Sequence, residues 1–247
     1  MRSMLKLILG LHIVGGSVAL LSMVIPLVTR KGGPTHRRTG WVVVSGMTIV
    51  SVTALVLSAS RFLLDPRPGG RRGAIFLFYV AILTAAAVSA GVRVLRAKHR
   101  TGRHTHPWDL GIAALLTATS IGMAVFGMLT ATPLFTGFSI IGLLSGGHRL
   151  AYWLRAPSHP MHWWFEHMTS MLGATIAATT AFLVVNADRL GSTTFSLIVW
   201  FAPTIIGVPV VVIWTAYYRR RFTSRRAQSG IARPAPAAVP YMPSRIA

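Results

Sequence analysis

Cysteine is absent from the 247-residue chain, and acidic residues nearly so, with only four Asp and Glu against 25 Lys and Arg. Without thiols the chain can form no disulfide, iron–sulfur cluster or thiolate metal site. Charged residues make up 12%, about half the share usual in soluble domains, whereas apolar residues make up 53% and the mean hydropathy is +0.59. Because so little polar surface could not cover a water-soluble globule, the sequence predicts an integral membrane protein.

Seven apolar runs account for this composition. Each approaches the ~20 residues that a helix needs to cross a bilayer, most are apolar on all sides, and the alternation of a spanning strand is missing. The expected fold class is all-α, a polytopic membrane helix bundle of about seven transmembrane helices. The runs are 4–28, 40–60, 73–95, 109–130, 134–154, 167–187 and 194–218.

Two short segments refine this prediction. Only Ala131-Thr132-Pro133 separates the fourth run from the fifth, which indicates a tight helical hairpin. Within the fifth run, Gly142 and Gly146 have the spacing of small residues that lets membrane helices approach closely, and we expect packing from it.

Basic residues are distributed unevenly between the two sides of such a bundle. With seven spans, the side of the N-terminus carries seven Lys and Arg and the other side eighteen. The positive-inside rule then predicts the N-terminus outside and the C-terminus inside. Arg outnumbers Lys 22 to 3, which suggests a GC-rich bacterial genome, and we expect the inner (plasma) membrane. Residues 1–218 would form a single transmembrane bundle, and residues 219–247 a basic, Pro/Ala-rich, disordered cytoplasmic tail.

The basic residues also indicate the partners. They lie in short gaps between apolar runs and in the tail, where anionic lipid headgroups account for them. We therefore expect the lipid bilayer and its anionic headgroups as partners, and no nucleic acid.

Histidine is the residue type that carries the functional prediction. His36, His148 and His167 lie near the ends of three different runs, on the predicted cytoplasmic side. At ~1.5 Å of rise per residue they reach similar depths, so we expect them to converge in one shallow layer. Neutral imidazole binds metal ions and haem iron, but histidine beside tryptophan also suits a headgroup belt. Three further histidines are expected in a solvated basic loop: His99, His104 and His106.

His12 differs from the others because it lies about eight residues into the first run, ~12 Å deep. A polar group buried there needs a partner. The partner expected is a helix carbonyl or a Ser or Thr of another span, and Gly15-Gly16-Ser17 would let a neighbouring helix come close.

Two segments carry a resemblance. The first has His12 and Gly15-Gly16 in one helix, the loop Lys31-Gly32-Gly33, and His36-Arg37 with Gly40 entering the next helix; the second is Trp163-Trp164-Phe165-Glu166-His167. Together they resemble bacterial membrane proteins of the domain of unknown function 2306 family, over most of residues 1–187. The resemblance implies a multi-pass membrane protein with no settled activity. His-Arg pairs at helix ends are also loosely similar to haem-b membrane electron-transfer bundles.

The first functional hypothesis is a haem-b or metal-binding protein with a redox role. Two of His36, His148 and His167 would be the axial ligands. Arg37 and Arg149 would pair with the haem propionates, because guanidinium binds carboxylates bidentately. Side chains that could line the ring are Trp41, Met47 and Met171.

Two alternatives stay open. One is a membrane metal-dependent hydrolase or hydroxylase that binds a divalent metal through His162, Glu166 and His167, with His159 nearby. Such a site needs several ligands and an open position for water, but the spacing departs from the His-x3-His that puts two ligands on one helical face. The other is a non-enzymatic role in assembly, sensing or small-solute transport, which the lack of carboxylates inside the spans also fits.

Overall fold

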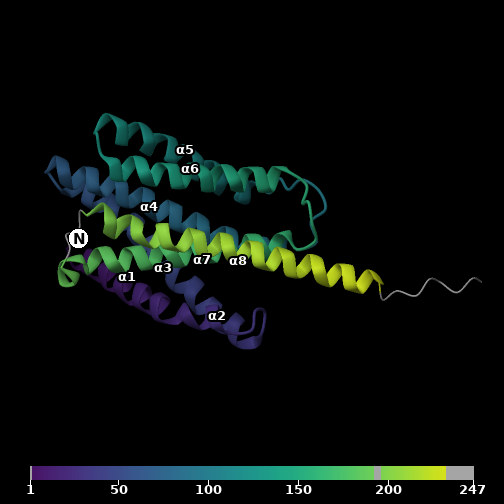
Figure 1. Cartoon of the computed structure of the whole chain (residues 1–247). Helices are drawn as coiled ribbons and strands as arrows, with labels where there is room; N and C mark the ends of the chain where they lie inside the picture. Colours follow the sequence, from purple (N-terminus) through teal and green to yellow (C-terminus); the bar gives the residue numbers. More distant parts are fainter. Residues whose placement is uncertain (1, 192–195, 232–247) are drawn as a thin grey trace, which may run out of the picture. The chain divides into compact units, whose positions relative to one another are not determined.

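The computed structural model describes residues 2–191 and 196–231, and these residues form helices and turns without strands (Figure 1). Long helices coincide with all seven predicted runs, which confirms the all-α class. The helices are α1 (Arg2–Ser22), α2 (Val24–Val28), α3 (Pro34–Leu64), α4 (Pro68–Arg93), α5 (Pro107–Leu129), α6 (Pro133–Leu154), α7 (His162–Val185) and α8 (Leu197–Ile231), with 3₁₀ helices η1 (Val94–Arg96) and η2 (Ala187–Leu190).

The chain divides into two compact units, Met1–Gly207 and Val208–Ala247. The boundary lies within α8, eleven residues before the end of the bundle predicted at residue 218. Helix α8 continues to Ile231, so the first part of the predicted tail is helical, and residues 232–247 lie outside the described residues. The site described below belongs to the first unit.

Within the described ranges, six helices are long and apolar enough to cross a membrane. The chain is therefore a multi-pass helical membrane protein. Helix α6 coincides with the fifth predicted run, 134–154, but is not among the six. It carries His148 and Arg149 near its end, which lowers its hydropathy.

Proline sets the start of four consecutive helices. Pro34, Pro68, Pro107 and Pro133 are the first residues of α3, α4, α5 and α6. Proline suits this position because its ring fixes a helical φ and the missing N–H would have no partner in the first turn. These four prolines therefore explain why the chain turns where it does.

Pro26 explains the break between α1 and α2. A proline inside a helix cannot donate to the carbonyl four residues earlier, which here belongs to Ser22, the last residue of α1. The Ser22 hydroxyl also donates to the Val18 carbonyl, at 2.6 Å. Helix α2 ends two residues after Pro26, so the carbonyl of Pro26 is available to other donors.

An aromatic core joins α4, α5 and α6 to the start of α8. Phe76 of α4 stacks on Phe135 of α6 with ring centroids 5.0 Å apart, and Phe138 lies 5.3 Å from Phe201. Tyr79 is buried in the same cluster, where its hydroxyl donates to the Phe138 carbonyl at 3.0 Å. A second, smaller cluster of Ala19, Met47, Val88 and Ala174 joins α1, α3, α4 and α7.

The packing predicted for Gly142 and Gly146 is confirmed. A Cβ atom at Gly142 would overlap the Tyr79 hydroxyl and the Ser120 hydroxyl, and one at Gly146 would overlap the Thr117 hydroxyl. Side chains at these positions would push α6 away from α4 and α5.

The turn between α5 and α6 is the predicted tight hairpin, and it has a strained residue. The Thr132 amide donates to the Gly127 carbonyl at 2.9 Å and the Ala131 amide to the Met128 carbonyl at 3.1 Å, the pattern of a Schellman motif. Ala131 holds the left-handed position with φ of 48°, where glycine is the usual residue.

Ala131→Gly should therefore stabilise the protein. Relief of the Cβ clash in the left-handed conformation is worth about 1 kcal/mol, which a thermal melt of the detergent-purified protein would measure as a higher Tm. Ala131→Val should lower Tm in the same assay, and a higher Tm for the valine variant would contradict the argument.

Candidate functional site

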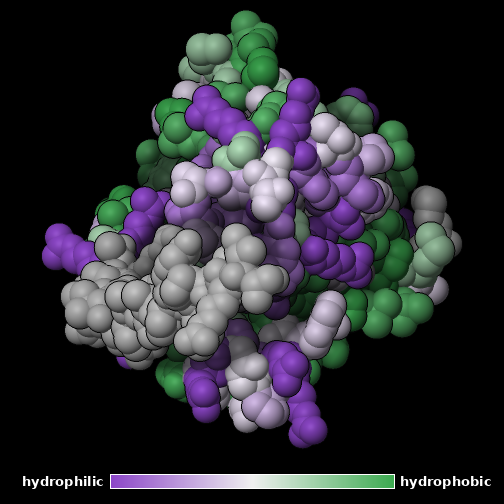
Figure 2. Space-filling model, turned by 90° about the vertical axis from the view of Figure 1, so that its right-hand side faces the viewer, coloured by the Kyte–Doolittle hydropathy of each residue, from purple (hydrophilic) through white to green (hydrophobic). Residues whose placement is uncertain are grey.

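Polar side chains gather at one end of the first unit. Helices α2 and α3, α4 and α5, and α6 and α7 run in opposite directions, so the ends of α2, α4 and α6 lie beside the starts of α3, α5 and α7 (Figure 1). Figure 2 looks onto this end and shows hydrophilic residues across it, with hydrophobic residues around them. This end holds every histidine of the predicted layer.

Two of the three predicted histidines meet there. The rings of His36, at the start of α3, and His167, in the second turn of α7, have centroids 6.3 Å apart and planes at 71°. Helices α3 and α7 are not adjacent in the sequence, and both histidines are partly buried. The sequence placed them in one layer, and the structure brings them into contact.

Each of these imidazoles is anchored through Nδ1. His36 Nδ1 lies 3.1 Å from the Pro26 carbonyl, and His167 Nδ1 lies 2.7 Å from the Gly91 carbonyl. A carbonyl only accepts hydrogen bonds, so Nδ1 carries the proton in both rings. In the neutral form of each ring the lone pair is then on Nε2, the atom that binds metals.

His36 and His167 are the residues of this layer that could hold a shared metal centre. Each would supply one imidazole nitrogen, and their ring centroids are 6.3 Å apart. Hydrogen bonds from the far ring nitrogen to backbone carbonyls are also the usual way in which proteins fix metal-binding histidines.

The Lys31-Gly32-Gly33 turn positions His36. Gly32 has a φ of +77°, which a residue with a side chain rarely adopts. Lys31 Nζ donates to the carbonyls of Pro26 and Leu27 at 2.8 and 2.5 Å, and burial lowers the pKa of Lys31. Since the Pro26 carbonyl accepts from both Lys31 and His36, this turn fixes the end of α2 against the start of α3.

Gly91 positions His167. A Cβ atom at Gly91 would overlap Met171 Cε and lie 3.2 Å from Ser170 Cβ. Its lack of a side chain lets α7 approach the backbone of α4, so that the His167 ring reaches the Gly91 carbonyl. Of the three side chains expected to line a cofactor ring, Met171 lies in this contact, Met47 is buried beside Ala19 and Val88, and Trp41 is exposed.

His148 has a different partner. Its Nε2 lies 2.9 Å from Glu166 Oε2, and its side chain is 64% exposed. Arg149 is buried: its Nη1 donates to the Ser170 hydroxyl at 3.1 Å and lies 3.9 Å from Glu166 Oε1. Arg149 is therefore engaged by α7 and is not free for a propionate, whereas Arg37 is exposed beside His36.

The side chains proposed for a hydrolytic metal site do not come together. His162 Nδ1 lies 2.7 Å from the Tyr152 hydroxyl, Glu166 pairs with His148, and His167 bonds to Gly91. His162 and Glu166 share a helical face, but His167 is ~100° around the helix from Glu166. Throughout residues 2–191 and 196–231, no three His, Asp or Glu side chains form a group that could hold a metal ion. His159, the other histidine of that hypothesis, packs its ring against Phe165.

A buried ionic cluster at the start of α5 was missed in the sequence. Asp109 is 5% exposed and accepts bonds from Arg93 Nε, from Arg93 Nη2 at 2.9 Å and from His104 Nε2 at 2.8 Å. The His104 ring also packs on Trp153 at 4.6 Å, so His104 is not in a solvated loop as expected. The sequence did offer one signal: Asp109 is one of only four acidic residues in the chain, and it lies in the first turn of a helix.

Arg100 holds the loop that carries His104. It donates to the carbonyls of Tyr152, Trp153 and Arg155 at 2.8–3.3 Å, and its guanidinium lies over the ring of Tyr152. These carbonyls end α6, where a cation compensates the helix dipole. The loop between α4 and α5 is thus tied to the end of α6 and covers this end of the bundle.

His12 has the buried partner that the sequence predicted. Its Nδ1 lies 3.0 Å from the Thr53 hydroxyl of α3. The Thr53 hydroxyl donates to the Ile49 carbonyl at 2.6 Å, so His12 Nδ1 is the donor in the pair.

This direction predicts unequal costs for two variants. His12→Leu leaves Thr53 bonded to Ile49 and should cost about 1 kcal/mol, whereas Thr53→Val takes the hydroxyl acceptor away from the partly buried His12 ring and should cost more, about 1–3 kcal/mol. Thermal melts would rank them, with Thr48→Val as a control on the exposed side of α3. Equal costs for Thr48→Val and Thr53→Val would contradict a bond between His12 and Thr53.

Comparisons of the chain with protein-family models, with curated proteins and with solved structures gave no match. The resemblance to the domain of unknown function 2306 family therefore stays a prediction from the residues quoted for it.

Proposed function

We propose that this membrane protein binds haem b between His36 and His167 and transfers electrons. The observation that supports the proposal is the ring pair: two imidazoles from separate helices, 6.3 Å apart, each held through Nδ1 by a backbone carbonyl. The haem iron would supply one-electron chemistry. The role of the protein is to hold two nitrogen ligands, from His36 and His167, at a fixed separation near the membrane surface.

The size of the ligand set favours haem over a bare metal ion. A structural zinc site needs four protein ligands and a catalytic one three, and no third His, Asp or Glu joins this pair in the described parts of the chain. A haem iron already has four porphyrin nitrogens, so two imidazoles complete its coordination. His148, which bonds to Glu166, has no ligand role in this proposal.

The direct test is the absorption spectrum of the full-length protein purified in detergent from haem-replete cells, with haem and metals quantified on the same sample. We expect a Soret band and close to one haem b per chain. Colourless protein that contains zinc or iron would favour a metal centre without porphyrin. Colourless, metal-free protein would leave the rings as a packing contact and overturn the proposal.

We also propose seven spans, in which α6 crosses the membrane in addition to the six helices named above. The N-terminus would lie outside and the C-terminus in the cytoplasm. Helix α6 has 22 residues, runs antiparallel to α5 and packs along it, and seven spans divide the basic residues seven to eighteen. In this orientation the His36–His167 pair lies on the cytoplasmic side of the inner membrane, near anionic headgroups.

Fusion reporters test this topology. A reporter after Arg221 should behave as cytoplasmic, and one in the turn between α3 and α4, after Asp65, should behave as external. The reverse pair of results would overturn the orientation, and two reporters on the same side would overturn the count of seven.

A further inference from the structure

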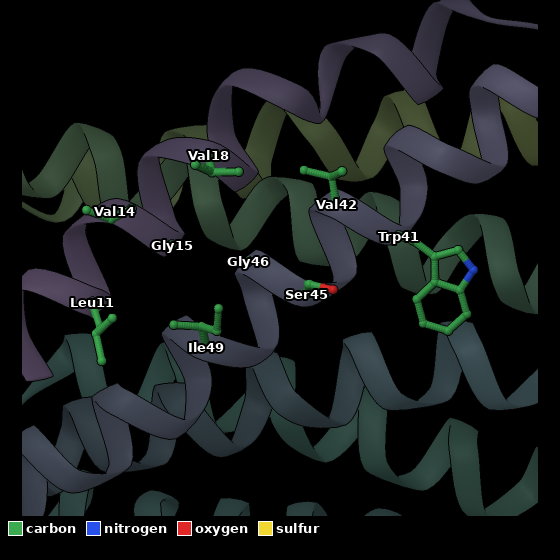
Figure 3. Close-up of a pocket in the computed structure, with 9 residues that line it drawn as sticks. All are labelled: Leu11, Val14, Gly15, Val18, Trp41, Val42, Ser45, Gly46 and Ile49. Carbon is green, nitrogen blue, oxygen red and sulfur yellow. The ribbon is translucent and has the colours of Figure 1, made fainter.

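A groove runs between α1 and α3 on the outer surface of the first unit. It encloses about 400 Å³, and Figure 3 shows α1 residues along one side and α3 residues along the other. The lining is apolar except for Ser45 and the Trp41 ring nitrogen. The residues are Leu11, Val14, Gly15, Val18, Trp41, Val42, Ser45, Gly46 and Ile49.

Glycines make the floor of the groove. A Cβ atom at Gly46 would lie 2.8 Å from the Gly15 carbonyl and 3.0 Å from Ala19 Cβ, so the two helices touch backbone to backbone there. The walls rise on either side of this contact, and Val14 and Trp41 are 62% and 60% exposed. The result is an elongated apolar groove, parallel to the helices and open to the hydrocarbon of the membrane.

Two positively charged side chains lie at one end of this groove. Arg37 and Arg38 precede Trp41 and Val42 by four residues each, so they lie on the same face of α3, ~6 Å further along its axis. Both are exposed. Lys31, by contrast, is bound to carbonyls of α2. Trp41 lies between the cations and the apolar groove, at the depth where tryptophan prefers the membrane interface.

We infer that the groove is the binding site of one anionic phospholipid of the surrounding membrane. An acyl chain lies along the groove over Gly15 and Gly46, and the phosphate lies at Arg37 and Arg38. The charge of the headgroup complements the two cations and the chain fills the apolar groove, so both parts of the lipid have a matching surface. The inference depends on residues of α1 and α3, and it shares Arg37 alone with the haem hypothesis, in which Arg37 would pair with a propionate.

The test is native mass spectrometry of the full chain in detergent with phosphatidylglycerol or phosphatidylcholine of the same acyl chains. The wild type should retain one phosphatidylglycerol more tightly than phosphatidylcholine. R37Q/R38Q should weaken phosphatidylglycerol binding on the order of tenfold, because each arginine near anionic lipid contributes several-fold. The matched control is R71Q/R72Q, which removes two exposed arginines from the first turns of α4, at the opposite end of the bundle.

A second variant, Ser45→Phe, fills the groove without changing charge and should weaken binding of both lipids. Equal losses of phosphatidylglycerol binding in R37Q/R38Q and R71Q/R72Q would mean that the lipid is attracted to positive charge in general, and would overturn the proposed binding site. Unchanged binding in Ser45→Phe would place the acyl chain elsewhere and overturn it as well. A dimer in the wild type that Ser45→Phe dissociates would make a second copy the occupant instead. Haem content measured on the wild-type and Ser45→Phe samples, in which His36, Arg37 and His167 are unchanged, separates failure of this inference from failure of the proposed function.

Discussion

His36→Ala and His167→Ala should each lower the haem content of the purified protein at least tenfold. Each substitution removes one of the two nitrogens that the proposal assigns to the iron, and loss of even a supporting group around a metal typically costs 10–100-fold in affinity. The measurement is the ratio of Soret absorbance to protein absorbance, with the haem extracted and quantified.

The control is His148→Ala. This histidine belongs to the same polar layer but bonds to Glu166, so its removal should leave the haem content unchanged. Imidazole added to His36→Ala should restore the lost band, which a purely structural role for His36 would not allow. Equal loss of haem in all three variants would indicate that the layer acts by stabilising the fold, and would overturn the assignment of His36 and His167 as the ligands.

Asp109→Ala should be among the most destabilising single substitutions in the chain. The carboxylate is buried and accepts bonds from Arg93 and His104, and removal of one partner from a buried ion pair leaves the other without compensation. Such losses cost about 3–5 kcal/mol. The expected result is a large fall in Tm, or little folded protein after extraction.

Asp65→Ala is the matched control. Hydrogen bonds from Arg67 lower the pKa of Asp65 to about 2. The Asp65 side chain is itself only 9% exposed, but its partner Arg67 is 77% exposed, whereas Arg93 beside Asp109 is 21% exposed. An ion pair with one partner in solvent contributes little. The Tm of Asp65→Ala should change far less than that of Asp109→Ala. A second comparison is Arg93→Met with Asp109→Leu, which should recover part of the lost stability because neither charge is then left alone. Equal falls in Tm for the two aspartate variants would contradict the argument that the shielded partners of Asp109 make its loss more costly.

The helices and their order could be predicted because lipid imposes a strong constraint on sequence. A span must be apolar for ~20 residues, and the polar segments between the runs are short, so the apolar runs predict where the long helices lie, and six of these helices are apolar enough to cross a membrane in the described ranges. Proline at the first position of α3 to α6 would have refined their starts. The depth of His36 and His167 followed from the same reasoning, since both lie near the start of a helix on the same side.

The partners of the histidines could be predicted only in part. Depth is readable from the sequence, but rotation about the helix axis is not when a helix is apolar on all sides. His148 and Arg149 are adjacent, yet one is exposed and the other buried, and neither orientation was visible in the pattern. The same limit explains why His162, Glu166 and His167, close in sequence, have three separate partners.

The buried Asp109 cluster could not be predicted for a different reason. Its members come from the end of α4, the loop before α5 and the start of α5, where the chain reads as polar and basic. Charged residues at helix ends usually face water, and only the closure of this loop by Arg100 onto the end of α6 buries them.

The measurement that tests the central claim most directly is electron paramagnetic resonance of the oxidised, full-length protein. Two imidazole nitrogens on one iron predict a low-spin ferric signal in the wild type, converted to a high-spin signal when either His36 or His167 is replaced by alanine. A wild-type protein with high-spin iron, with iron outside porphyrin, or with no iron signal at all would contradict the claim that these two histidines hold a haem.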